Sequence, residues 1–248
     1  MATAVVHYLA SAITDRGRKR PSNEDAFGYS VEDGVYLVCD GMGGAAAGEI
    51  ASSLAVDEML RLLEGQGRGA SAGPMPELLE QAIAAANEAI FSRSQRNHRL
   101  NGMGTTLVAL AVRERHAWVL NVGDSRCYRL RNGHLEQITA DHSLVEEQVR
   151  SGRMTPADAQ RSPLKNVITR ALGTQSRVTA DVFALETEPG DLFLLCTDGL
   201  TRELPDAMIE SMLQTSRSLA DHCTCLVEAA KKAGGQDNIT CMLVRAEA

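Results

Sequence analysis

Short apolar runs that meet an aspartate constrain this chain more than any other feature of its 248 residues. Asp40 and Asp198 each come at the end of an apolar run and precede a glycine, Asp237 comes just before a third run, and Asp25 lies in a polar turn. Such runs predict buried strands, and a strand end can direct a side chain into a cleft. Several carboxylates directed at one point repel each other unless cations neutralise them. The sequence therefore predicts a site for hard metal ions.

Composition and charge exclude several classes of protein. A net charge of −7 argues against non-specific nucleic-acid binding, which needs a basic surface. Residues 1–8 lack the basic start and the long apolar stretch of a secretory signal, and no apolar run approaches the ~20 residues that span a bilayer. We therefore expect a cytoplasmic protein with neither a leader nor an anchor, and with no nucleic-acid or membrane partner.

The cysteines and histidines give no sign of a soft-metal site. The six cysteines are scattered without a Cys-x-x-Cys pair, which predicts buried reduced thiols rather than disulfides or zinc ligands. The six histidines show neither His-x-His nor His-Glu-x-x-His spacing. Oxygen ligands alone suit Mg²⁺ or Mn²⁺ rather than Zn²⁺.

The hydrophobic periodicity predicts alternating blocks of strands and helices. A glycine-rich stretch at 65–74 joins two helices, Asn132–Gly133 is a strong hairpin signal, and 141–170 is a polar, partly helical insertion. Two strand-rich blocks interleaved with two helix pairs predict an α+β fold, a four-layer αββα sandwich of two mainly antiparallel sheets, in a single domain over 1–248. The expected strands are 4–13, 35–39, 105–112, 117–122, 127–130, 135–138, 192–196 and 239–245, and the expected helices are 47–63, 77–94, 205–214 and 219–233.

A set of short motifs along nearly the whole chain resembles the metal-dependent (type 2C) Ser/Thr protein phosphatase family, in its compact bacterial form. Matching so many motifs in one order is highly specific. The motifs are Asp15–Gly17, Arg20–Phe27, Asp40–Gly44, Gly104–Thr106, Asn121–Arg126, Asp141–Ser143, Asn166–Gly173, Thr197–Leu200 and Asp237–Thr240.

The resemblance implies a role for each matched residue. Asp40 would bridge two Mn²⁺ or Mg²⁺ ions, the Gly41 carbonyl would bind one ion, and Asp198 and Asp237 would complete the other. Asp25, with Glu24 as a second candidate, would hold metal-bound waters. Arg20 would bind the phosphate in a bidentate fork that lysine cannot reproduce. An activated water would then hydrolyse phospho-Ser and phospho-Thr on proteins, opposing a bacterial Ser/Thr kinase, and we expect a monomer.

Several residues could have either a functional or a purely structural role. Asp124 resembles the ligand of a third, weaker metal, but it could equally cap a turn. Asp141–Ser143 could suggest a catalytic triad, yet adjacent residues cannot reach each other, and a capped helix start fits better. Met42 stands where eukaryotic relatives carry a histidine thought to protonate the leaving group, so a water must serve here. Residues 144–170 resemble the family's flap beside the active site, and would otherwise be a surface insertion.

Two other functions match part of the sequence. Gly41–Ala46 fits a dinucleotide-binding fingerprint, but Asp40 would face the pyrophosphate and no second strand follows the helix. A pseudophosphatase that only binds phosphoproteins would need a broken metal set, yet Asp40, Asp198 and Asp237 are all present. Arg20 itself could be a solvated charge, but only it keeps the family's spacing to Asp25.

Overall fold

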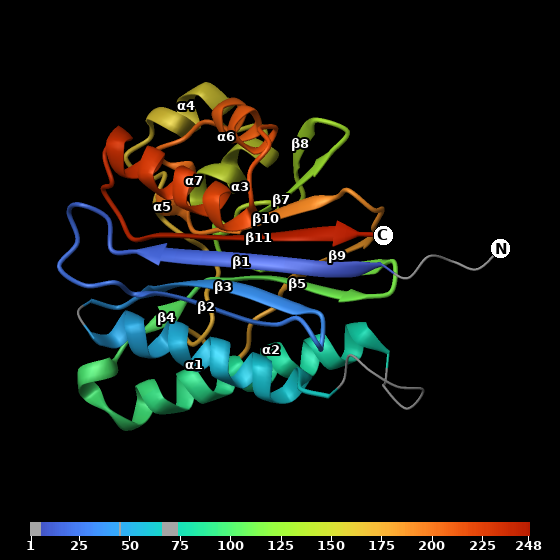
Figure 1. Cartoon of the computed structure of the whole chain (residues 1–248). Coiled ribbons are helices and arrows are strands. Elements are labelled where there is room, and N and C mark those ends of the chain that lie inside the picture. The colour runs from blue at the N-terminus through green and yellow to red at the C-terminus, as the bar shows by residue number, and fades with distance from the viewer. Residues whose placement is uncertain (1–5, 45, 66–73) are drawn as a thin grey trace.

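Two antiparallel sheets lie face to face, with helices on both outer surfaces (Figure 1). The structure is a computed structural model, and it describes residues 6–44, 46–65 and 74–248. The first sheet has the order β1 (His7–Asp15), β11 (Ile239–Glu247), β10 (Leu192–Cys196), β7 (Arg126–Arg131) and β8 (His134–Gln137). The second has the order β2 (Asp25–Ser30), β3 (Val35–Met42), β5 (Leu107–Arg113), β6 (His116–Val122) and β9 (Asp181–Glu186), and β4 (Gly104–Thr105) pairs with the end of β3.

The helices form the two outer layers. On the second sheet lie α1 (Ala46–Leu63) and α2 (Met75–Arg96), followed by the short 3₁₀ turn η1 (His98–Leu100). On the first sheet lie α5 (Asp198–Thr201), α6 (Asp206–Leu213) and α7 (Leu219–Ala233). The insertion before β9 carries α3 (Leu144–Arg150) and α4 (Pro156–Arg161). This arrangement confirms the predicted α+β fold with two antiparallel sheets.

Burial on both faces explains why the central strands read as continuous apolar runs. On β3, Val35, Leu37 and Cys39 pack toward α1 and α2, whereas Tyr36 and Val38 pack toward the other sheet. Successive side chains of a strand point to opposite faces, so a strand buried on both faces must be apolar at every position. Strand β10 is built in the same way, with Phe193 and Leu195 between the sheets.

Most predicted elements are present within a few residues of their expected ends, but two strands were not predicted. Strand β9 is an edge strand whose exposed and half-buried residues alternate, and Val182 is 41% exposed. Strand β2 contains Gly28 and is only partly buried. Neither segment has the uninterrupted apolar run that signals a central strand. The expected strand at 4–13 extends to Asp15, and its residues 4 and 5 lie outside the described part of the chain.

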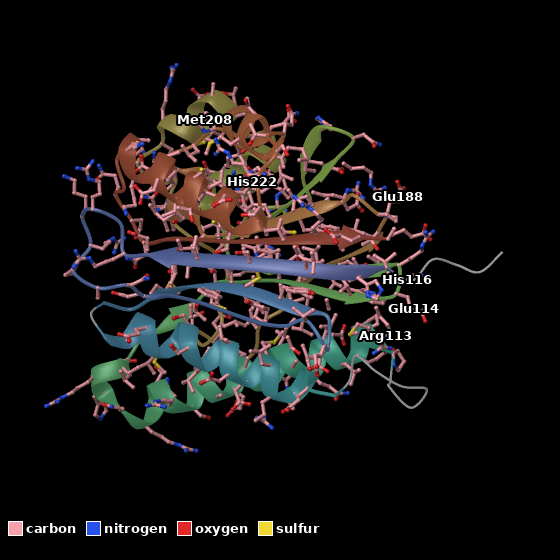
Figure 2. The ribbon with its side chains drawn as sticks, viewed as in Figure 1. Arg113, Glu114, His116, Glu188, Met208 and His222 are labelled. Atoms are coloured by element: carbon pink, nitrogen blue, oxygen red, sulfur yellow. The ribbon has the colours of Figure 1, made fainter. Side chains whose placement is uncertain are left out.

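The hairpins and the candidate site lie at opposite ends of the sheets. Figure 2 shows Arg113, Glu114 and His116 at the end where the C-terminus lies. Positive φ angles of 53° at Asn132 and 78° at Gly133 confirm the tight turn predicted there. At the other end of the sheets β1 finishes, β3 and β10 reach their carboxyl ends, and β11 begins. The four strand-associated aspartates therefore belong to one end of the molecule.

Two smaller expectations are also met. The Ser143 hydroxyl accepts a hydrogen bond from the Glu146 backbone N–H at 3.3 Å, so Ser143 caps α3 as predicted. Five cysteines are buried and Cys225 is half-buried, and all six are free thiols. Over the described ranges, the structure contains no helix that combines the length and the apolar character needed to cross a membrane.

Candidate metal centre and active site

The strand-end carboxylates gather around one cavity of about 290 Å³. Asp40 lies near the end of β3, directly opposite Asp25 in the register of β2 and β3. Asp198 is the first residue of α5, and Asp237 lies two residues before β11. Asp40, Asp198, Asp237 and Asp124 line the cavity, together with Gly41, Arg20 and Glu24. The structure thus brings together every site residue predicted from the sequence, with Asp25 behind Asp40.

The backbone of Asp40 is fixed on both sides. Its N–H donates to the Thr106 hydroxyl at 2.9 Å, and its carbonyl accepts from the Thr106 N–H and from the Thr105 hydroxyl, each at 2.9 Å. These three bonds fix the position of the backbone from which the carboxylate extends to the cavity. Burial raises the pKa of Asp40 well above its ordinary value, and the charges of four neighbouring aspartates raise it further.

Glycines allow the segments that carry these aspartates to touch. A Cβ at Gly41 would collide with the carbonyl oxygens of Gly48 and Glu24, and one at Gly199 would collide with the carbonyl oxygen of Asn238. The Gly41 N–H donates to the Glu24 carbonyl at 3.1 Å. The Asp-Gly pairs therefore reflect close approach of one backbone to another as well as the turns that the sequence suggested.

Asp25 lies opposite Asp40 on the neighbouring strand, outside the cavity lining, and is nearly fully buried. The hydroxyls of Thr197 and Thr240 donate to its Oδ2 at 2.9 and 2.6 Å, while its Oδ1 has no partner. Burial raises the pKa of Asp25 to about 7, although the two hydroxyl bonds act in the opposite direction. A buried carboxylate oxygen without a donor is costly, and it indicates a position where a cation or its water would be favourable.

The carboxylate and carbonyl oxygens around the cavity suit hard divalent cations. In the structure, the carboxylates of Asp124, Asp198 and Asp237 pair with arginines. Arg202 contacts the carboxylates of Asp198, Asp237 and Asp124, and Arg20 Nη2 lies 2.7 Å from Asp237 Oδ2. As placed, no three His, Cys, Asp or Glu side chains of the described residues converge closely enough to hold an ion. The Oδ1 atom of Asp198 is buried without a partner, like that of Asp25. Oxygen donors are the ligands that Mg²⁺ and Mn²⁺ prefer, and a bound cation would relieve the repulsion between these carboxylates.

Asn238 holds the N-terminal loop beside Asp237. Its side-chain amide donates to the carbonyls of Arg16 and Ser22 at 2.9 and 2.8 Å and accepts from the Glu24 N–H at 2.9 Å. This places Arg20 and Glu24 at the cavity from a loop without regular structure. The sequence showed Asn238 only as part of a motif, because nothing local reveals that its partners are more than 200 residues away.

A buried histidine supports the turn that presents Asp124. The His142 side chain is 1% exposed, and its Nδ1 accepts from the Gly123 N–H at 3.1 Å. The proton therefore lies on Nε2, which is 3.1 Å from the Asp181 carboxylate. Asp181 also accepts from Arg170 at 2.8 Å. Sequence reasoning did not find this chain, because Asp181 belongs to the edge strand β9 that was not predicted.

Comparisons with known proteins identify the family of this chain. The sequence profile of the family described as Protein phosphatase 2C matches residues 15–244. The Serine/threonine phosphatase stp of Listeria innocua is 39% identical over 234 residues, covering 93% of each chain. The crystal structure of the Mycobacterium tuberculosis serine/threonine phosphatase PstP/Ppp has a TM-score of 0.90 and 36% identity, covering 99% of this chain and 100% of that one.

A second solved structure relates the fold to metal. It is the catalytic domain of serine threonine protein phosphatase PstP in complex with two manganese ions, with a TM-score of 0.88, 34% identity, and coverage of 98% of this chain and 100% of that one. This chain belongs to the protein phosphatase 2C family, and it is a serine/threonine phosphatase. The family and the activity predicted from the order of motifs are confirmed.

Proposed function

We propose that the aspartate-lined cavity is a centre for Mn²⁺ or Mg²⁺ at which this enzyme hydrolyses phospho-Ser and phospho-Thr on proteins. One observation carries the proposal: Asp25 and Asp198 are buried beside the half-buried Asp40, and one carboxylate oxygen of Asp25 and one of Asp198 have no donor. Buried like charges persist only where counter-charges join them. A dinucleotide-binding function gains no support, because Asp40 and Asp124 line the space where a pyrophosphate would lie.

Each residue has a stated part in this proposal. Asp40 and the Gly41 carbonyl would hold metal from β3, Asp198 and Asp237 would hold it from the first sheet, and Asp25 would accept hydrogen bonds from water. When bound, a pair of divalent ions supplies a water of lowered pKa and neutralises charge on the phosphate. Arg20 would bind two phosphate oxygens and so orient the phosphorus. Met42 has no ionisable group, so the proton for the leaving oxygen must come from water.

Four narrower features belong to the same proposal. Asp124 would bind a third, weaker ion, held in place by the turn that His142 supports. Residues of the flap, about 144–170, contribute Asn166 and Ile168 to the cavity and would shape access to it. The chain would act as one catalytic domain and as a monomer. Its cellular opponent would be a Ser/Thr kinase whose phosphorylated substrates it reverses.

Hydrolysis of p-nitrophenyl phosphate tests the metal requirement. We expect turnover with Mn²⁺, loss of turnover in EDTA and recovery when Mn²⁺ is added back, measured by release of p-nitrophenol. A phosphoserine peptide assayed under the same conditions ties the activity to protein substrates. Turnover that continues unchanged after chelation and dialysis would contradict the mechanism.

Arg20→Ala should mainly weaken binding of phosphosubstrates. A charge-assisted pair contributes about 1.5–3 kcal/mol, so KM for a phosphopeptide should rise roughly 10- to 100-fold. Arg20→Lys should recover only part of this loss, because an ammonium cannot bind two oxygens in a fork. Arg18→Ala is the matched control, since Arg18 lies in the same loop and, among the described residues, its guanidinium hydrogen-bonds only to the Lys231 carbonyl. An unchanged KM in Arg20→Ala would show that Arg20 does not bind the phosphate and is an ordinary surface charge.

A further inference from the structure

A second cavity adjoins the catalytic one and has no part in the mechanism above. It has a volume of about 470 Å³ and is lined by residues of the segment 169–181. Asn166 and Ile168 line the catalytic cavity, and Thr169 and Arg170 line the second, so one continuous stretch of chain separates the two. We call the second space the Arg177 cavity.

The walls of the Arg177 cavity are fixed by buried contacts. Asn87, buried on α2, accepts from the Gly173 N–H at 2.8 Å and donates to the Gln175 carbonyl at 3.0 Å. Leu172 pairs with Thr105 in an isolated bridge, and β4 in turn pairs with the end of β3 that carries Gly41. Packing thus holds this irregular segment at a set position relative to the catalytic aspartates.

The chemistry of the Arg177 cavity suits an anion. Arg177 is exposed, and its guanidinium makes no ion pair or hydrogen bond within the described ranges. Arg170 is partly neutralised by Asp181, the single carboxylate of the lining. Thr174 and Thr179 also line the space, and the Thr174 hydroxyl donates to the Ala171 carbonyl at 3.0 Å. An unpaired guanidinium presents a fork of N–H donors that recognises carboxylates and phosphates.

We propose that the Arg177 cavity binds a second anionic group of the phosphoprotein substrate, a carboxylate or a further phosphate close in sequence to the residue being dephosphorylated. This inference rests on the proposed function, since it assigns the substrate class of the same active site. The net charge of −7 strengthens this inference. An acidic protein surface does not attract acidic peptides in general, so a local basic cavity would favour only peptides whose negative group reaches it.

The test compares phosphothreonine peptides that differ only in their second charge. One peptide series carries Glu at single positions on either side of the phosphothreonine, a second carries phosphoserine there, and a third carries Gln. The readout is the kcat/KM for dephosphorylation of the threonine alone, taken as the ratio of each anionic peptide to its Gln counterpart. Because the ratio is taken within one enzyme variant, a general change in activity cancels.

We expect wild type to prefer at least one anionic position by about five- to tenfold, and Arg177→Glu to abolish or invert that preference. Arg177→Lys should retain part of it. Arg93→Glu on α2 is the matched control, because it makes the same charge change at an exposed position outside both cavities and should keep the wild-type ratio. Preference for the Glu series alone assigns the cavity to carboxylates, and preference for the phosphoserine series alone assigns it to a second phosphate.

Two outcomes would overturn the inference, namely a wild-type ratio near one at every position or the same preference in Arg177→Glu as in wild type. Neither outcome would affect the proposed function, because the Gln peptides would still be hydrolysed. If wild type with Mn²⁺ hydrolysed none of the three series, the proposed function would fail first.

Discussion

Replacing any one of Asp40, Asp198 and Asp237 by asparagine should lower kcat by about 10³-fold or more while the fold persists. The proposed ions stabilise the transition state by several kcal/mol, and each 1.4 kcal/mol corresponds to a factor of ten in rate. Asparagine keeps the shape of the side chain but removes the charge that holds a cation. Since removal of any one of the three should disrupt the same centre, their effects should not add.

These three substitutions also differ in their expected effect on the metal-free protein. Asp40 carries a pKa raised by burial and by four carboxylates, so Asp40→Asn removes repulsion and should raise the melting temperature in EDTA. Asp57→Asn is the control, an exposed aspartate on α1 outside the cavity. Circular dichroism checks the fold, and steady-state kinetics with a phosphopeptide checks the rate. Near-normal kcat in all three variants, at saturating Mn²⁺, would end the metal-centre assignment.

The aspartates could be found from the sequence because each lies beside a run whose burial is visible in the residues themselves. The first five residues of β3 and all five of β10 are apolar, so the ends of these runs, and hence Asp40 and Asp198, were predictable. The glycines that follow them marked positions where backbones approach closely. The aspartates at the strand ends could therefore be predicted from the sequence alone.

The supporting residues could not be found in this way, because their partners are brought together only by the tertiary fold. Arg202 reaches three aspartates from the turn after α5, yet its sequence surroundings are unremarkable for a surface arginine. Asn238 and His142 act through backbone groups of distant loops. Prediction of β9 would have required recognising an edge strand, whose alternation of exposed and half-buried residues is a weak signal.

The aspartates and their supporting residues are linked by the repulsion between neighbouring carboxylates. The fold brings four acidic segments to one point. Hydrogen bonds with Thr105 and Thr106 hold the Asp40 backbone there, and the hydroxyls of Thr197 and Thr240 donate to the Asp25 carboxylate. In the structure, Arg20 and Arg202 reduce the remaining repulsion. If cations bind as proposed, they would displace these ion pairs and free Arg20 for a phosphate. Metal binding and substrate binding would then be coupled through the same guanidinium.

The stability of the metal-free protein should decrease as the pH rises from about 5 to 8, and Mn²⁺ should reverse that trend. The pKa of Asp25 is about 7 in the folded protein, and its ordinary unfolded value is about 3.9. Between these values the folded state binds more protons than the unfolded state, so the free energy of unfolding falls as the pH rises through this window. The raised pKa values of Asp40 and Asp198 act in the same direction.

Other groups titrate differently, and the measurement must separate them. The pKa of Asp15 and of Asp181 is lowered, so their stabilisation is lost only below their ordinary range, at pH values under about 4. Burial lowers the pKa of His222, so its effect opposes the trend below about 6.5, where the unfolded state gains the proton first. Comparing wild type with Asp25→Asn cancels these contributions, because both proteins contain them.

Melting temperatures in EDTA and in Mn²⁺, measured from pH 5 to 8, test the argument. Mn²⁺ requires ionised carboxylates, so its stabilisation should grow with pH, and at 100 times Kd it should reach about 2.7 kcal/mol. For a chain of this size that corresponds to roughly 5–11 °C. In EDTA, Asp25→Asn should show a flatter pH dependence than wild type, since its amide does not titrate. A metal-free melting temperature with the same pH slope in both proteins, and no Mn²⁺ effect at pH 8, would mean that these carboxylates neither repel one another nor bind the ion.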